Sequence, residues 1–229
     1  MRAADSAADA PVPSAARRRR ERERAEARAT ILAAARALAR EEGWDAVTMR
    51  RLADRIAYSA NFAYRYFTGR DDILLALVRD GFTRLRERMA AAAEQAPGSA
   101  PVDAVRRAGH AYLDFALAEP DLYQVMYGLG GVRVPTADTF AEGQAVGDLL
   151  TALLTEAGDP AAVRHVLRLW ATAHGLVALL GVGRLEPDPE HLHALLDDAL
   201  DDVLRTLPAT RGSGAGRADP ADPGTGAPR

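Results

Sequence analysis

Apolar residues recur along most of this chain at the three- and four-residue spacing that is typical of amphipathic helices. No stretch shows the alternation of apolar and polar residues that a half-buried strand requires. Together with prolines and glycines at the interruptions, the pattern predicts helices over residues 71–93, 102–118, 120–127, 137–157, 160–182 and 187–207. With the shorter helices before residue 71, the sequence predicts an all-α protein of about nine helices.

Residues 48–67 contain two short helical patterns joined by a tight turn. Thr48 and Ser59 are each placed to cap one of these helices, because a hydroxyl can accept a hydrogen bond from an unpaired backbone N–H. The apolar Phe67 ends the motif. The second helix is predicted to expose small, polar and aromatic side chains, which suits insertion into the major groove of DNA.

This segment resembles the DNA-binding domain of the TetR family of bacterial transcriptional regulators. Residues 31–43 look like the family's first helix, and residues 44–48 like its entry into the motif. The pair Tyr66-Phe67, followed by Arg70 and Leu74, resembles its exit. The resemblance implies a three-helix DNA-binding domain over residues 24–84. Residues 1–23 are expected to form a disordered basic arm, because they begin with a stretch rich in alanine, aspartate and proline and continue into a run of arginines.

The turn and the second helix depart from the family pattern. The family usually has glycine where this chain has Ala57. We expect a positive φ there, which costs a residue with a Cβ about 1 kcal/mol. At Asn61, Phe62 and Ala63 the family often has Gly-Thr and a branched aliphatic residue, so its base preference does not transfer to this chain.

Side chains of the motif can be assigned to DNA contacts by their chemistry. Asn61 and Arg65, with Ala60, are candidates for base edges, since asparagine pairs with adenine and arginine with guanine. Phe62 is either a core residue or an apolar contact to a thymine methyl. The resemblance implies phosphate contacts for Tyr64, Tyr66 and Arg70. The predicted DNA-binding residues are Thr48, Arg50, Ser59, Ala60, Asn61, Phe62, Tyr64, Arg65, Tyr66 and Arg70.

The later helices resemble one branch of TetR-type ligand domains. The resemblance lies in residues 112–116 and 120–123 and in the Trp170, His174-Gly175 pattern. It implies a helical ligand-binding and dimerisation domain over residues 85–207. Ligand sites are mostly apolar with a few polar groups, although core packing is the alternative for each residue singly. The predicted ligand-binding residues are His110, Tyr112, Phe115, Tyr123, Met126, Tyr127, Trp170 and His174.

The last two helices carry apolar faces that suit a four-helix dimer interface. Symmetric half-sites require two recognition helices about 34 Å apart, which favours a homodimer. Burial of these faces within one subunit is the alternative. The predicted interface residues are Leu167, Leu192, Leu195, Leu196, Ala199 and Val203.

Charge is unevenly distributed along the chain of 229 residues. Residues 1–67 hold 14 arginines against 9 acidic residues, and the remainder is net acidic. This asymmetry favours double-stranded DNA as the partner of the N-terminal part. The run of arginines at residues 17–20 is either a solvated helical extension, paired at i,i+4, or an arm that touches phosphate or enters the minor groove.

Several classes of function are disfavoured. The chain has no cysteine, which excludes disulfides and thiol chemistry. No apolar run of about 20 residues and no signal-peptide core is present, so we expect a cytoplasmic protein without a membrane span. The glycine-rich residues 127–131 follow a helix, whereas a dinucleotide fingerprint needs a strand. Asp197 and Asp201 are interpreted as an exposed acidic face.

These observations predict a non-enzymatic DNA-binding regulator without metal or catalytic residues and without a cofactor other than an unknown small-molecule effector. A ligand-responsive repressor, acting as a homodimer on a palindromic operator, is the main hypothesis. A sequence-tolerant architectural DNA-binding protein is the alternative. Residues 208–229 are expected to form a disordered tail because they are rich in glycine and proline and lack periodicity.

Overall fold

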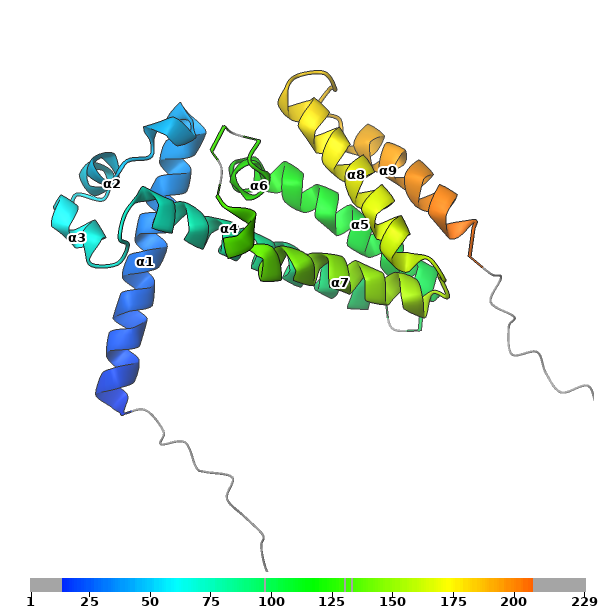
Figure 1. Ribbon diagram of the computed structural model, residues 1–229, viewed down its shortest axis with the longest axis horizontal. Coiled ribbons are helices and arrows are strands. Elements are labelled where there is room, and N and C mark those ends of the chain that lie inside the picture. The colour runs from blue at the N-terminus through cyan, green and yellow to red at the C-terminus, as the bar shows by residue number, and fades with distance from the viewer. Residues whose placement is uncertain (1–13, 97, 130, 133, 208–229) are drawn as a thin grey trace, which may run out of the picture.

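The computed structural model describes residues 14–207 except positions 97, 130 and 133. In this part of the chain all regular structure is helical, with nine α-helices (Figure 1). The prediction of an all-α fold is therefore confirmed. Residues 1–13 of the expected arm and the expected tail at residues 208–229 lie outside the described residues.

Most helix boundaries follow the sequence pattern closely. The helices are α1 (Ala15–Glu42), α2 (Met49–Arg55), α3 (Ala60–Tyr64), α4 (Arg70–Glu94), α5 (Pro101–Ala118), α6 (Pro120–Tyr127), α7 (Phe140–Glu156), α8 (Ala162–Gly181) and α9 (Pro189–Leu204). Proline stands in the first turn of α5, α6 and α9, where its missing N–H has no partner to lose. Helix α7 begins at Phe140 rather than residue 137, because a short 3-10 helix (Thr136–Asp138) precedes it.

Helix α1 is much longer than predicted and corrects the expectation of a disordered arm that ends at residue 23. Residues 15–23 belong to the same helix as residues 31–42. Ion pairs of Arg17 with Glu21 and of Arg19 with Glu23 join successive turns of this extension. The helical interpretation of the arginine run is the one that the structure supports.

Helices α1, α2 and α3 and the first turns of α4 enclose one end of the core. Large residues there are fully or almost fully buried: Ile31, Leu38, Trp44, Val47, Leu52, Phe67, Ile73 and Leu74. Phe67, which follows α3, is 1% exposed and so closes the motif as its sequence position predicts. The core holds the three short elements in place against the long α1.

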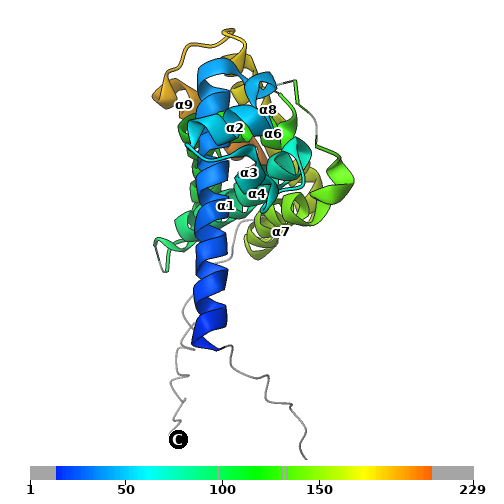
Figure 2. The ribbon, with the colours of Figure 1, turned by 90° about the vertical axis from the view of Figure 1, so that its left-hand side faces the viewer.

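Helix α4 leaves this N-terminal unit and continues into the second bundle, where it packs on α5, α6 and α7 (Figures 1 and 2). Helix α8 packs against α7 and α9, and α9 lies on α5. One helix therefore belongs to both parts of the molecule. Among the described residues, no helix combines the length and apolarity needed to cross a bilayer.

Candidate DNA-binding surface and ligand cavity

The turn between α2 and α3 has the predicted backbone geometry. Ala57 has a φ of 56°, the only positive φ of a non-glycine residue in the described chain. Thr48 caps α2, since its hydroxyl accepts a hydrogen bond from the Arg51 N–H at 3.3 Å. Ser59 stands at the N-cap of α3, but its side chain makes no capping hydrogen bond within the described residues.

Helix α3 presents a polar and aromatic surface. Ala63 is fully buried, whereas Asn61, Tyr64 and Arg65 are exposed. The structure therefore brings three of the predicted contact residues to one accessible face. Arg50 is exposed on α2, and the side chain of Ala60 lies outside the described atoms.

Aromatic rings run beside this face. The Phe62 ring is half-buried, stacks on Tyr58 at a centroid distance of 4.1 Å and lies 5.1 Å from Tyr66. The Arg65 guanidinium lies 4.9 Å from the Phe62 centroid. Tyr58, which is 54% exposed, was not among the predicted contacts. Its spacing of four residues from Phe62 was the signal that could have found it.

Arg70 lies at the junction of the N-terminal unit and α4. Its Nε donates to the Val47 carbonyl at 2.9 Å, and its Nη2 donates to the Trp44 carbonyl at 3.1 Å. These bonds attach the start of α4 to the segment that enters the motif. The geometry thus gives Arg70 an orienting role in addition to its predicted phosphate contact.

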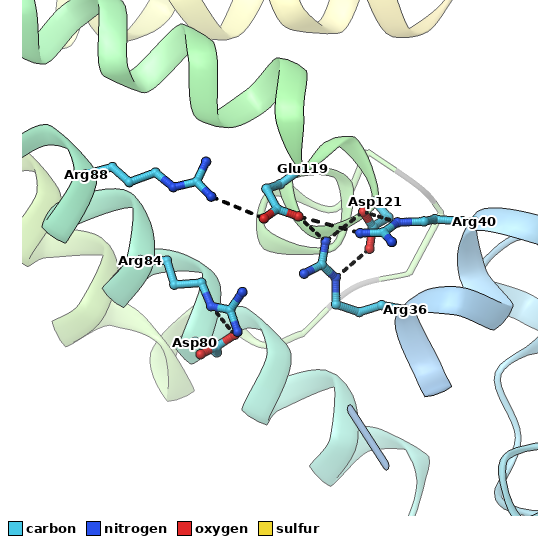
Figure 3. A network of polar contacts seen from close by, with 7 residues as sticks. All are labelled: Arg36, Arg40, Asp80, Arg84, Arg88, Glu119 and Asp121. Atoms are coloured by element: carbon cyan, nitrogen blue, oxygen red, sulfur yellow. Dashed lines mark hydrogen bonds and ion pairs between the residues drawn. The ribbon is translucent and has the colours of Figure 1, made fainter. Parts of the chain in front are cut away.

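A network of charged side chains joins α1 to the start of α6 (Figure 3). Arg36 donates to both Asp121 oxygens, from Nε at 2.7 Å and from Nη2 at 2.9 Å. Arg40 adds a bond from Nε at 2.9 Å. Glu119 accepts from Arg36 and, at 3.3 Å, from Arg88 of α4. Three helices therefore meet at two carboxylates.

The network keeps both carboxylates ionised. The Asp121 side chain is only 4% exposed. Burial by itself raises its pKa, but the hydrogen bonds and charges of Arg36 and Arg40 outweigh burial, so the pKa of Asp121 lies below its ordinary value. The pKa of Glu119 is lowered in the same way, since Arg36 and Arg88 outweigh its burial. The arginines thus stabilise the charged form of this contact.

A cavity of about 750 Å³ lies among helices α4 to α9. Its wall is largely apolar, with Val78, Phe82 and Met89 contributed by α4. Residues with polar groups also line it: Tyr112, Tyr127, Thr139, Gln144, Asp148, Thr151 and Trp170. The volume and lining suit a mostly apolar small molecule held by a few polar contacts.

The structure places only some of the predicted ligand residues at this wall. Tyr112, Met126, Tyr127 and Trp170 line the cavity, and the other four predicted residues are not part of the lining. Phe115 is fully buried. His110 bonds to Asp197 through Nε2 at 2.8 Å.

Tyr123 and His174 lie behind the wall in a chain of hydrogen bonds. The Tyr112 and Tyr123 hydroxyls are 2.8 Å apart, and Tyr123 Oη is 2.8 Å from His174 Nδ1. Burial raises the pKa of Tyr123 and lowers the pKa of His174, so both groups are neutral near pH 7. The hydrogen-bonded pair of Tyr123 and His174 therefore supports Tyr112 at the wall.

The acidic face of α9 is occupied by an arginine. Arg106 of α5 donates to Asp197 at 2.7 Å and to Asp201 at 2.5 Å. Among the described residues, no group of three or more histidine, cysteine, aspartate or glutamate side chains is arranged to hold a metal ion. The two carboxylates therefore hold α9 against α5.

The predicted dimer residues fall into two sets. Leu192, Leu196 and Val203 are at most 2% exposed within one subunit, while Leu195 and Ala199 are half-buried. Leu167 is 59% exposed, and Val163, Trp170, Leu179 and Val182 are also exposed on or just after α8. Val163, Leu167 and Trp170 line the mouth of the cavity as well. The free apolar face therefore lies mainly along α8, and much of the α9 face is covered by α5.

Two family profiles match the chain. The profile described as bacterial regulatory proteins, tetR family, matches residues 31–77. The profile described as the tetracyclin repressor-like C-terminal domain matches residues 105–203. Together they cover more than half of the sequence and both parts of the fold.

Known proteins resemble most of the chain. The uncharacterized HTH-type transcriptional regulator YobS of Bacillus subtilis is 26% identical over 168 residues, which are 72% of this chain and 84% of that protein. A protein of unknown function from Rhodococcus has a TM-score of 0.68 with 30% identity and covers 79% of this chain and 95% of its own. A TetR-family transcriptional regulator from Streptomyces coelicolor has a TM-score of 0.64 with 25% identity, covering 80% and 96%.

Proposed function

The chain belongs to the TetR family of bacterial transcriptional regulators, and from that premise we propose that it is a ligand-responsive repressor that binds a palindromic operator as a homodimer. The observation that carries this proposal is the position of α4. Its first residue, Arg70, bonds to the segment that enters the DNA-binding motif, and Val78, Phe82 and Met89 line the cavity. A ligand in the cavity would therefore contact the same helix that orients the DNA-binding motif.

The proposed mechanism is a shift between two conformers. An effector changes DNA affinity only if it binds one conformer more tightly than the other. We propose that an apolar small molecule favours a position of α4 in which the two recognition helices no longer match successive major grooves, about 34 Å apart. Tyr112, Tyr127 and Trp170 would supply its polar and aromatic contacts.

On the DNA side, the exposed residues of α3 are proposed to read the operator. Asn61 and Arg65 would contact base edges, and Tyr64 would donate to a phosphate. Arg50 and Thr48 would add contacts from α2. Tyr66 and Arg70 would position the motif, because both also hold contacts within the protein.

The homodimer is proposed to use the exposed apolar face of α8. Leu167, Leu179 and Val182 are each more than 40% exposed, and exposed apolar surfaces of this kind mark protein interfaces. With the half-buried Leu195 and Ala199 on α9, two subunits would form a four-helix bundle. A monomer in sedimentation at micromolar concentration would contradict this arrangement.

Genomic footprinting of the bound sites tests the proposed function. We expect a palindromic sequence whose affinity exceeds that of random competitor DNA at least about a thousandfold at physiological salt. A library of apolar small molecules should contain compounds that release the purified protein from this site. Equal affinity for operator and random DNA would instead indicate an architectural protein, and release by no compound would indicate a constitutive binder.

A further inference from the structure

The N-terminal part of α1 stands clear of the rest of the described chain in two perpendicular views (Figures 1 and 2). Residues 14–26 are exposed throughout, and residues 17–28 contain seven arginines and three glutamates. An isolated helix is only marginally stable in water. Packing within the described subunit does not explain why this basic helix extends so far.

Four of the seven arginines of the extension share one side of the helix. Because an α-helix has 3.6 residues per turn, residues three and four apart share one side. One side, here named the arginine stripe, is formed by Arg17, Arg20, Arg24 and Arg28. The stripe continues into Ile31, Ala35 and Leu38, which are buried against the DNA-binding motif. The stripe therefore lies on the side of α1 that carries the motif.

Acidic residues are kept away from the centre of this stripe. Glu23 and Glu26 lie on other sides of the helix, and Glu21 stands at the edge, where it pairs with Arg17 at 2.9 Å. Arg20 has no ion-pair partner among the described residues. A polyanion approaching this side would thus meet positive charge.

The stripe is joined to the end of the recognition helix. Two guanidinium groups lie near the Tyr66 ring, with Arg24 at 5.9 Å and Arg65 at 5.6 Å from its centroid. Arg28 donates to the Tyr66 carbonyl at 2.6 Å and lies 4.0 Å from the Phe67 centroid. DNA that Arg65 contacts would therefore lie close to Arg24 and, one turn further, to Arg20.

We propose that the arginine stripe is a second DNA-contact element, which binds the phosphates that flank the half-site read by α3. The inference rests on the proposed function. An α-helix with its side chains is about 10–12 Å wide, whereas the minor groove is about 6 Å wide, so the helix contacts the backbone from outside the groove. Its arginines stand about 6 Å apart along the axis, close enough to engage successive phosphates.

The salt dependence of DNA affinity tests the stripe directly. Each phosphate contact adds about 0.9 to the slope of log K against log salt concentration. We expect Arg20→Ala combined with Arg24→Ala to lower the magnitude of the slope by about 1–2. The matched control combines Arg18→Ala with Arg22→Ala, which removes the same charge from the other side of the helix. It should lower the slope by less than about 0.5.

Three outcomes separate the alternatives. Equal slopes for both double variants would overturn the stripe, because only total charge would then matter. An unchanged slope in the Arg20→Ala/Arg24→Ala variant would show that the extension does not contact DNA, and it would leave the proposed function intact. Failure of the unaltered protein to bind any footprinted DNA would count against the proposed function itself.

A second variant tests whether the extension acts as a rigid helix. Ala25→Pro removes no charge but breaks a helix interior. We expect a smaller salt slope and loss of hydroxyl-radical protection beyond the half-site, with thermal unfolding of the remaining protein unchanged, because residues 14–26 are exposed. Full protection in this variant would contradict a rigid helix and support a flexible arm.

Discussion

Ala57 carries the positive φ of the turn between α2 and α3, and its side chain is exposed. Glycine adopts this conformation without the steric cost of a Cβ, about 1 kcal/mol or more, which outweighs the entropy that glycine loses on folding. We expect Ala57→Gly to raise the free energy of unfolding by about 0.5–1 kcal/mol in denaturant titrations. The matched control is Ala33→Gly in exposed helix, where the same change should destabilise by about 1 kcal/mol.

Asn61 is the exposed residue of α3 best suited to read a base. Its amide can pair with both polar groups at the major-groove edge of adenine. We expect Asn61→Ala to weaken discrimination at one operator position by about 1–3 kcal/mol, measured by competition with single-base operator variants. Tyr64→Phe is the comparison, since loss of a phosphate contact should weaken binding to all sequences equally. A uniform loss for Asn61→Ala would exclude base reading.

The junction of α1 and α6 is the clearest case in which one element depends on another. Asp121 is buried against Arg36 and Arg40, and loss of its charge would leave both arginines dependent on Glu119 alone in this network. We expect Asp121→Asn to lower the free energy of unfolding by about 3 kcal/mol. Glu23→Gln, in the exposed pair with Arg19, should change it by less than about 0.5 kcal/mol. Similar effects for both variants would contradict the burial argument.

The same junction predicts an acid sensitivity. The pKa values of Asp121 and Glu119 are lowered in the folded protein, so their contribution to stability is present above the unfolded pKa, about 4. It is lost as pH falls through the folded values. The melting temperature should therefore fall more steeply between pH 6 and pH 2.5 in the unaltered protein than in the Asp121→Asn variant. Parallel curves would show that the network does not set the acid limit.

For the molecule as a whole, the cavity offers a way to separate ligand response from DNA binding. Gly147 of α7 lines the cavity, and a Cβ added there meets no heavy atom within 4 Å. We expect Gly147→Leu to fill part of the cavity and abolish release from DNA by an effector. Operator affinity should stay unchanged within about twofold, because a side chain that fits both conformers equally well does not shift the equilibrium between them. Ala152→Leu, exposed on the same helix, is the control and should respond normally in gel-shift titrations.

Much of this arrangement could be predicted from the sequence because its signals are local. The cap at Thr48, the apolar Phe67 and the prolines that begin α5 and α6 each act within a few residues of the chain. The positive φ at Ala57 follows from the glycine that the resembling family usually has at this position. The prediction of a disordered arm at residues 15–23 is wrong, because the charge of this segment suits an arm while its i,i+4 pairs suit a helix equally well.

Other features depend on residues that are distant in sequence. No local pattern pairs Arg36 with Asp121, 85 positions away, or directs Arg70 to the carbonyls of Val47 and Trp44. The apolar pattern of α9 is equally consistent with a dimer interface and with packing on α5. Only the structure shows which aromatic residues of α5 and α6 line the cavity and which lie in the core behind it.

By itself, then, the sequence determined the helices, their ends and the motif that places this chain among DNA-binding regulators, because hydrogen bonds and caps in helices join residues at most a few positions apart. The tertiary structure alone decided which faces are covered, where the cavity lies and how α1 joins α6. These outcomes depend on burial and long-range pairing, which exist only once the helices have packed together.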